Sequence, residues 1–159
     1  MYLKSVQPRG LLSFSLATPP LELSKLNVLI GPNGAGKSNL FESLRLLKTS
    51  AGGGQNLQAF FARYGGIGDW IWKGPDGGEA SIEVVLAGES KRMPLRYRLA
   101  FREQRGRLTI ADERLENEKP TKPGKKPFLY IGHEAADVYV NLQREASCSQ
   151  ERMLAQGRV

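Results

Sequence analysis

The sequence predicts an α/β fold in which a buried strand leads into a helix and an antiparallel sheet follows. Leu26–Ile30 is a continuous apolar run, which is typical of a strand buried on both faces. A glycine-rich loop follows this run, and Ser38–Thr49 then carries apolar residues at helical spacing. Between Ile82 and Ile110, apolar and polar residues alternate, as they do in strands with one solvent-facing side.

The remaining elements can be placed around this frame. Strands are expected at Tyr2–Gln7 and Leu11–Leu16, before the turn marked by Pro19-Pro20. The helix after the loop is expected to bury one side, formed by Leu40, Phe41, Leu44 and Leu47. Aromatic residues predict a second, short helix around Phe60, Phe61 and Tyr64. The later strands are expected at Ile82–Leu86, Leu95–Phe101, Leu108–Ile110, Phe128–Ile131 and Asp137–Leu142, with an exposed loop at Asn117–Pro127.

Composition limits the class of protein. The 159 residues, 40% hydrophobic and 25% charged, suffice for one compact domain with its own core. No apolar run approaches the ~20 residues that span a bilayer, and the N-terminus lacks a secretory signal, so a cytoplasmic protein without membrane contact is expected. The single cysteine, Cys148, cannot form an internal disulfide. It lies in a polar stretch without a nearby histidine, which argues against a catalytic nucleophile.

The net charge is +7, with an isoelectric point near 9.7, so contact with a polyanion is worth considering. The densest basic stretch runs from Lys91 to Arg107, with seven basic residues and only Glu103 in opposition. Its charges fit the solvated face of a strand better than a nucleic-acid patch, although both interpretations stay open. Trp70 and Trp72 fit core packing or a local lid better than base stacking.

The segment Gly31–Ser38 matches the pattern G-x-x-x-x-G-K-[ST] at every fixed position. The glycines permit backbone angles at which successive N–H groups turn toward phosphate oxygens, at the start of a helix whose dipole favours anions. A strand before the loop and a helix after it form the context that this motif requires. A turn that merely joins strand and helix is the weaker alternative, and the glycine spacing excludes a dinucleotide-binding motif.

The motif therefore predicts a P-loop that binds ATP with Mg²⁺. Lys37 is expected to contact the β- and γ-phosphates, Ser38 to offer its hydroxyl to Mg²⁺, and Asn33 to reach the γ-phosphate. The residues of the loop expected to bind the nucleotide are Gly31, Pro32, Asn33, Gly34, Ala35, Gly36, Lys37 and Ser38.

Hydrolysis also requires an acidic residue at the end of a second buried strand. Asp112-Glu113 is the one similar sequence, but its strand alternates and is flanked by arginines, as in a wet hairpin. His133 is the only histidine, and a lone histidine is more often structural than catalytic. Glu134 and Gln143 are weak alternatives as Mg²⁺ or water ligands. No catalytic residue is assigned from the sequence.

At this point a resemblance is visible. The run LNVLIGPNGAGKSNLFESLRLL resembles the amino-terminal segment of the SMC/RecF-like branch of ABC-type ATPases. It is most similar to the AAA family ATPases grouped with RecF-like and OLD-like enzymes, and the likeness extends over residues 1–145. Asn33 and Asn39 are typical companions of the motif in that branch. The resemblance therefore adds Asn39 to the nucleotide-binding residues.

The resemblance implies a P-loop NTPase half-domain with a core sheet, a P-loop helix and an antiparallel β lobe. Residues 1–50 would form the P-loop core, 51–78 a glycine-rich connection, 79–145 the antiparallel lobe and 146–159 the start of a helical lobe. Family members continue through a helical lobe, a signature segment, a Walker B strand and a switch histidine. None of these is recognised in this sequence, so residues 1–159 resemble the amino-terminal half of a nucleotide-binding head.

In the family, two heads dimerise with ATP between them. The implied function is the ATP-binding portion of a RecF/SMC-like ATPase in DNA repair, DNA maintenance or phage defence, with an ATP-dependent homodimer and DNA as partners. Hydrolysis is expected to be negligible with these residues alone. A non-hydrolysing nucleotide-dependent switch is the alternative. A small P-loop kinase is disfavoured, because parallel strands alternating with helices should then follow the loop.

Overall fold

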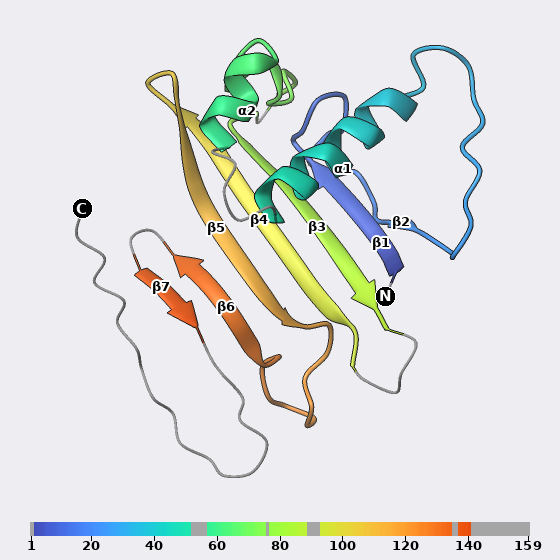
Figure 1. The fold of residues 1–159 in the computed structure, drawn as a ribbon, viewed down its shortest axis with the longest axis vertical. Helices are drawn as coiled ribbons and strands as arrows, with labels where there is room; N and C mark the ends of the chain where they lie inside the picture. Colours follow the sequence, from blue (N-terminus) through green and yellow to red (C-terminus); the bar gives the residue numbers. More distant parts are fainter. Residues whose placement is uncertain (1, 52–56, 76, 89–92, 135–136, 141–159) are drawn as a thin grey trace.

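The computed structural model describes residues 2–51, 57–75, 77–88, 93–134 and 137–140. In this part of the chain, seven strands form one sheet in the order β2-β1-β3-β4-β5-β6-β7 (Figure 1). Every neighbouring pair of strands is antiparallel. The strands are β1 Tyr2–Arg9, β2 Leu21–Glu22, β3 Glu79–Ala87, β4 Leu95–Gln104, β5 Arg107–Asn117, β6 Leu129–Glu134 and β7 Asp137–Val140.

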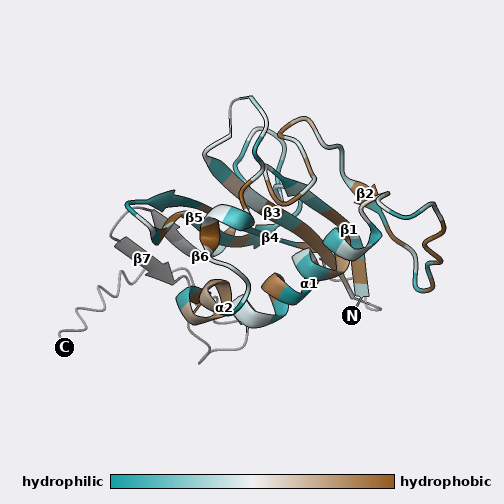
Figure 2. Ribbon diagram, turned by 90° about the horizontal axis from the view of Figure 1, so that it is seen from above, coloured by the Kyte–Doolittle hydropathy of each residue, from teal (hydrophilic) through white to brown (hydrophobic). Residues whose placement is uncertain are grey.

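The helices are α1 Lys37–Ala51 and α2 Leu57–Arg63, followed by the short 3₁₀ helix η1 Ile67–Asp69. Both α-helices lie on the same face of the sheet (Figure 2). The sequence prediction of an α/β fold with a P-loop helix and an antiparallel sheet is therefore confirmed, and so are both helices. The exposed loop predicted for Asn117–Pro127 is present between β5 and β6, except that Asn117 is the buried last residue of β5.

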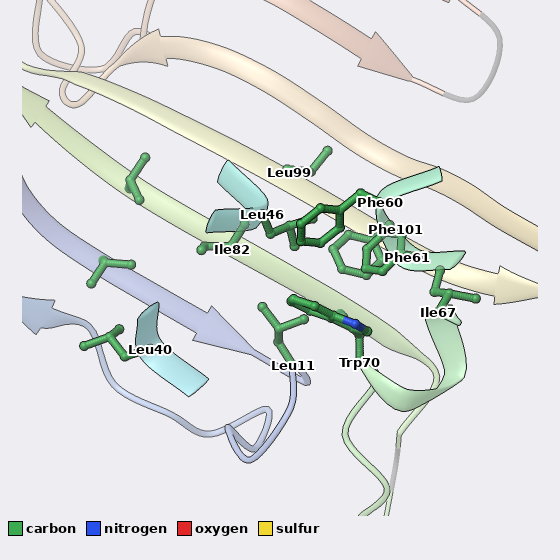
Figure 3. Close-up of a cluster of buried hydrophobic side chains, with 13 residues drawn as sticks. Leu11, Leu40, Leu46, Phe60, Phe61, Ile67, Trp70, Ile82, Leu99 and Phe101 are labelled. Atoms are coloured by element: carbon green, nitrogen blue, oxygen red, sulfur yellow. The ribbon is translucent and has the colours of Figure 1, made fainter. Parts of the chain in front are cut away.

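The core lies between the two helices and the sheet (Figure 3). Phe61 of α2 is 1% exposed and stacks edge-on against Trp70, while its ring also meets Phe101 of β4 with a centroid distance of 5.3 Å. Aromatic rings arranged edge to face bury large areas and add ~1 kcal/mol per pair beyond that burial. The predicted core role of Trp70 is confirmed, because this ring is 3% exposed.

The buried side of α1 agrees with the predicted one except at Phe41. Leu40 is buried and Leu44 and Leu47 are partly buried against the core, whereas Phe41 is 60% exposed. The buried residues of the helix are Leu40, Ser43, Leu46 and Thr49. Two polar residues can occupy this side because each hydroxyl donates a hydrogen bond to a helix carbonyl four residues earlier, Ser43 to Asn39 at 2.8 Å and Thr49 to Arg45 at 3.0 Å.

The strand predicted at Leu11–Leu16 is absent. Gly10 and Leu12 both have positive φ angles, so the chain turns there, and Leu11 forms isolated bridges with Phe14 and Ile71 instead of a ladder. The turn lets the fully buried Leu11 enter the core. It also joins this segment to the one after η1, because the Leu12 N–H donates to the Trp70 carbonyl at 2.6 Å.

The strand predicted at Leu26–Ile30 is absent as well. None of the backbone hydrogen bonds between described residues involves this segment, and the side chains of Leu26, Val28 and Ile30 are 84%, 77% and 90% exposed. An apolar run forms a buried strand only where another strand supplies hydrogen bonds. Within the described chain, the edge of β1 pairs with β2 instead, so the run has no neighbour.

Part of the basic stretch on β4 is neutralised by β5. Arg96 forms an ion pair with Glu116 at 2.8 Å, and Arg98 forms one with Asp112 at 3.0 Å. Asp112 also accepts from Arg114 at 2.8 Å, so it separates two arginines that lie opposite each other in the register. These pairs agree with a solvated strand face, whereas Arg102, Arg105 and Arg107 at the β4–β5 hairpin are exposed and form no ion pair with a described residue.

Candidate nucleotide-binding site

The glycine-rich loop lies between the exposed Leu26–Ile30 segment and the N-terminus of α1. A hollow of about 360 Å³ opens there. It is lined by Asn33, Gly34, Gly36, Lys37, Ser38 and Asn39. The structure therefore brings six of the nine predicted residues together around one hollow. The other three, Gly31, Pro32 and Ala35, shape the loop behind it.

Two glycines have the backbone angles that the loop requires. Gly34 has a φ of +84° and Gly36 a φ of +85°, which is the left-handed region that other residues rarely adopt. A Cβ atom at Gly34 would meet no neighbour within 4 Å, so its requirement is purely conformational. At Gly36 a Cβ atom would also come within 3.4 Å of the Ser13 hydroxyl.

The first turn of α1 presents unused donors to this hollow. The N–H groups of Lys37, Ser38 and Asn39 take part in none of the backbone hydrogen bonds of the described residues, and the first such bond of the helix runs from Leu40 to the Gly36 carbonyl. Unsatisfied N–H groups and the positive end of the helix dipole together favour an anion at this position.

The side chain of Lys37 is bound by backbone carbonyl groups of the glycine-rich loop. Its ammonium group donates to the carbonyls of Gly31 and Pro32, both at 2.7 Å. These two contacts hold the ammonium group against the loop, and Lys37 lines the same hollow as Ser38 and Asn39. A phosphate oxygen would offer Lys37 a charged partner in place of neutral carbonyls, and charge-assisted hydrogen bonds are roughly twice as strong.

Ser13 is a residue of this site that the sequence did not indicate. Its hydroxyl accepts a hydrogen bond from the Asn39 side-chain amide at 2.7 Å, although the two residues are 26 positions apart. Ser13 comes from the turn after β1, the region where a regular strand was predicted. No local pattern marks Ser13, because only the turn that buries Leu11 places it beside the loop.

Asp112 and Glu113 do not lie in this site. Asp112 is bound by two arginines, and Glu113 accepts a hydrogen bond from the Tyr97 hydroxyl at 2.8 Å. Tyr97 lies 3.4 Å from Ser50, at the C-terminal end of α1. Twelve residues of helix separate that end from Ser38, which is about 18 Å at 1.5 Å per residue.

Among its described lining residues, the hollow contains no carboxylate. The described part of the chain also contains no cluster of three or more His, Cys, Asp or Glu side chains that could hold a metal ion. For Mg²⁺, the protein ligand that the loop offers is therefore the exposed Ser38 hydroxyl. A metal held by one hydroxyl must take its other ligands from phosphates and water, which is how Mg²⁺ is usually held beside a triphosphate.

The other predicted candidates lie elsewhere. His133 and Glu134 are in β6, where they pair with Glu113 and Asp112 of β5 in the register. Gln143 and Cys148 fall outside the described residues. Trp72 is half-buried and lines a different hollow with Lys73 and Arg105. Trp72 is not among the described residues that line the hollow at the P-loop.

A glycine loop with left-handed residues, free N–H groups at the start of a helix and a lysine beside them define a P-loop nucleotide-binding domain. Comparison with known proteins agrees. Residues 26–133 match the family described as "AAA domain, putative AbiEii toxin, Type IV TA system". The chain belongs to this family, and with it to the SMC/RecF-like, ABC-type ATPases.

Two curated relatives are chromosome partition proteins Smc. The protein of Clostridium kluyveri is 29% identical over 101 residues, and that of Mycolicibacterium paratuberculosis is 30% identical over 101 residues. Each alignment covers 61% of this chain and 8% of the relative. A solved structure from work on ATP-driven dimerization and DNA stimulated activation of SMC ATPases is 18% identical, with a TM-score of 0.46, and covers 69% of this chain and 72% of that one.

The chain thus spans less than a tenth of the length of these curated relatives. Within its described part, no helix is long and apolar enough to cross a membrane.

Proposed function

We propose that residues 1–159 bind Mg²⁺-ATP at Gly31–Asn39 and act as the P-loop part of an SMC/RecF-like ATPase. The observation that carries this proposal is the set of free N–H groups at the start of α1, at a hollow that Lys37 also lines. Such a set attracts phosphate by both hydrogen bonding and charge. Membership of an ATPase family supports ATP as the nucleotide.

In this proposal each side chain of the loop has a distinct role. Lys37 leaves the carbonyls of Gly31 and Pro32 and contacts the β- and γ-phosphates. Ser38 gives its hydroxyl to Mg²⁺, whose chemistry is to neutralise the charge that develops on the phosphates. Asn33 binds near the γ-phosphate. Asn39, fixed by its hydrogen bond to Ser13, lines the phosphate side of the hollow.

We further propose that hydrolysis requires a strand from outside the described residues. The described lining of the hollow has no carboxylate to hold the Mg²⁺ shell or to position water. The exposed Leu26–Ile30 segment leads directly into the loop and carries an unpaired backbone. A second apolar strand beside it would cover the three exposed side chains and could carry an acidic residue to the phosphates.

The biological setting follows from the relatives. Chromosome partition proteins suggest DNA maintenance, and the family description suggests a toxin–antitoxin system and hence defence against phage. An ATP-dependent homodimer fits both settings, because a ligand that binds only the closed pair stabilises it by mass action. The alternative is a switch that binds ATP without turnover. The bare hollow, which lacks an acidic group among its described lining residues, is the observation that favours it.

The test is calorimetric titration of Mg²⁺-ATP into the 159-residue chain and into Lys37→Ala, with phosphate release measured in the same samples. Binding by the native chain that is lost in Lys37→Ala, without phosphate release, is the expected result. Retained affinity in Lys37→Ala would remove the P-loop from the proposal. Phosphate release by the native chain would show that an acidic residue within these 159 residues completes the site. Asp112→Asn and Glu113→Gln are then the first variants to measure.

A further inference from the structure

The loop between β5 and β6 carries an unpaired cluster of positive charge. Four lysines, Lys119, Lys122, Lys125 and Lys126, lie within it and are exposed. Their ammonium groups form no hydrogen bond or ion pair with any described residue. The one carboxylate of the 117–127 segment, Glu118, is already bound to Lys4 at 2.6 Å.

This lysine loop differs from the other basic part of the molecule. On β4 and β5, Arg96, Arg98 and Arg114 lie beside carboxylates, so their charges are largely cancelled at short range. The arginines of the β4–β5 hairpin form a separate group of three, at the other end of the sheet from the lysine loop. Charges that are cancelled by neighbours attract a polyanion weakly, whereas free charges add to the local potential. The lysine loop therefore holds four uncancelled positive charges within residues 119–126.

The lysine loop is held in shape by its base and by its backbone. The Asn117 N–H donates to the Phe128 carbonyl at 2.9 Å, and the Glu118 N–H donates to the Pro94 carbonyl at 2.8 Å. The Asn117 side chain, in a residue that is 5% exposed, accepts from the Tyr130 hydroxyl at 3.0 Å. Between these anchors the loop contains Pro120, Pro123 and Pro127, each of which fixes a φ angle.

Gly124, with a φ of +76°, makes the turn at which the Lys125 N–H donates to the Lys122 carbonyl at 3.2 Å. A backbone restricted in this way loses little conformational entropy on binding, and only the lysine side chains have to be ordered. A loop with a fixed backbone and flexible lysine side chains suits binding to a polymer that carries regularly spaced negative charges.

We propose that the lysine loop is a docking surface for the phosphate backbone of duplex nucleic acid. Lysines act as point charges on flexible stems, which suits phosphate contacts and carries no base specificity. The tip, residues 119–126, contains no aromatic or aliphatic side chain larger than proline or threonine that could insert into a lipid bilayer or stack on an unpaired base. These features favour a duplex backbone over a membrane or a single strand.

The position of the lysine loop separates this surface from the nucleotide site. The loop lies at the lower end of the sheet in Figure 1, whereas α1 begins near the upper end. DNA at the loop would therefore leave the hollow at Gly31–Asn39 open. The inference rests on the DNA-linked part of the proposed function and assigns the surface that would contact DNA, but its test does not require ATP.

The experiment measures binding of a fluorescent duplex of about 30 base pairs at salt concentrations between about 50 and 200 mM. Each phosphate contact contributes about 0.9 to the slope of log affinity against log salt. Replacing all four lysines by glutamine should therefore lower that slope by about 3 to 4 and weaken binding more than tenfold at the lowest salt. Replacing them by arginine should keep the slope within about 1 of the native value.

A matched control removes charge from the opposite end of the sheet. Arg102, Arg105 and Arg107, at the β4–β5 hairpin, are exposed and form no hydrogen bond or ion pair with a described residue. Arg→Gln at all three therefore changes net charge without touching the lysine loop. This control should change the slope by less than about 1. An equal loss in the control, or an unchanged slope in the glutamine variant, would overturn the proposal.

Two further outcomes decide the class of partner. If vesicles containing phosphatidylserine, or polyglutamate, bind with the same lysine dependence while duplex DNA does not, the surface docks a membrane or an acidic protein and the nucleic-acid proposal is wrong. The ATP site is tested separately, because the glutamine variant should keep its affinity for Mg²⁺-ATP and Lys37→Ala should keep the salt slope. If the native chain does not bind Mg²⁺-ATP, the proposed function is wrong. The assignment of the lysine loop as the DNA surface still stands in that case, provided that its salt slope is as expected.

Discussion

The exposed segment before the P-loop gives the sharpest test of the structure. Replacing Leu26 by Ser, Val28 by Thr and Ile30 by Thr should leave the stability of the monomer nearly unchanged, because these side chains are 84%, 77% and 90% exposed. Surface substitutions of this kind usually shift the free energy of unfolding by no more than ~0.5 kcal/mol each. If the segment were the buried strand that its composition suggests, each substitution would cost several times more.

The same substitutions should strongly weaken self-association or docking of a second strand. Together the three side chains expose the equivalent of about two and a half apolar residues, and burying one fully is worth about 1.5–3 kcal/mol. The surface available to a partner is therefore worth about 4–7 kcal/mol, as an upper estimate. Loss of most of it should lower the association constant by on the order of 10²–10³-fold.

Sedimentation velocity over a range of protein concentrations measures the association, and urea unfolding measures the stability. Val84→Thr is the matched control, because Val84 is 3% exposed and the substitution is identical to Val28→Thr. Val84→Thr should lower the free energy of unfolding by about 1–3 kcal/mol, because it places a hydroxyl group in the core. Two results would refute the reasoning: a Val28→Thr cost equal to that of the control, or a native chain that stays monomeric at every concentration.

Three further predictions concern the site and the sheet. Gly36→Ala should cost about 1–2 kcal/mol in urea unfolding and weaken ATP binding about tenfold, because its φ is +85° and its Cβ would contact the Ser13 hydroxyl at 3.4 Å. Ser13→Ala should weaken ATP binding about two- to fivefold in calorimetry, because the amide of Asn39 loses its acceptor. Burial raises the pKa of Tyr97 above its ordinary value of 10.0, so Tyr97→Phe should flatten the fall of stability at high pH.

The sign of the last prediction follows from proton binding. Above pH 10 the tyrosine of the unfolded chain has lost its proton while Tyr97 of the folded chain keeps it, so its stabilisation is complete below pH 10 and is lost as the pH rises. The loss is up to about 1.4 kcal/mol per pH unit. Urea unfolding from pH 9 to about pH 11 measures it. Parallel curves for the native chain and Tyr97→Phe would contradict the assignment.

The Gly36→Ala and Ser13→Ala predictions each have an outcome that would contradict them. Gly34→Ala introduces the same left-handed strain as Gly36→Ala but meets no neighbour, so the difference between them reports the contact with Ser13. Equal effects would remove that contact from the explanation. A Ser13→Ala variant with native affinity for ATP would show that Asn39 is positioned without its help.

Much of the site could be read from the sequence because a P-loop is a local device. The left-handed angles of Gly34 and Gly36, and the placement of Lys37 at the start of a helix, depend on residues within one short segment. The antiparallel strands were readable for a similar reason, since alternation along each strand reflects the two faces of a sheet. The nucleotide itself stays a prediction, to be tested by the titration described above.

The remainder depends on which segments meet. Residues 11–16 and 26–30 have strand-like composition, yet neither forms a ladder, because hydrogen bonds require a neighbour that sequence periodicity does not specify. The same limit applies to charge. Arg96 and Glu116 are 20 positions apart, and only the register of β4 and β5 shows that they neutralise each other.

By itself, then, the sequence determined the glycine-rich loop, the helix behind it and the alternating strands, since each is encoded by neighbouring residues and their backbone preferences. Only the tertiary structure decided that Ser13 accepts a hydrogen bond from Asn39. It also decided that Asp112 and Glu113 bind side chains of the sheet, far from the P-loop, and that the apolar run before the loop is exposed. Long-range contacts set these outcomes, because burial and hydrogen bonding depend on the partner that the fold brings to each residue.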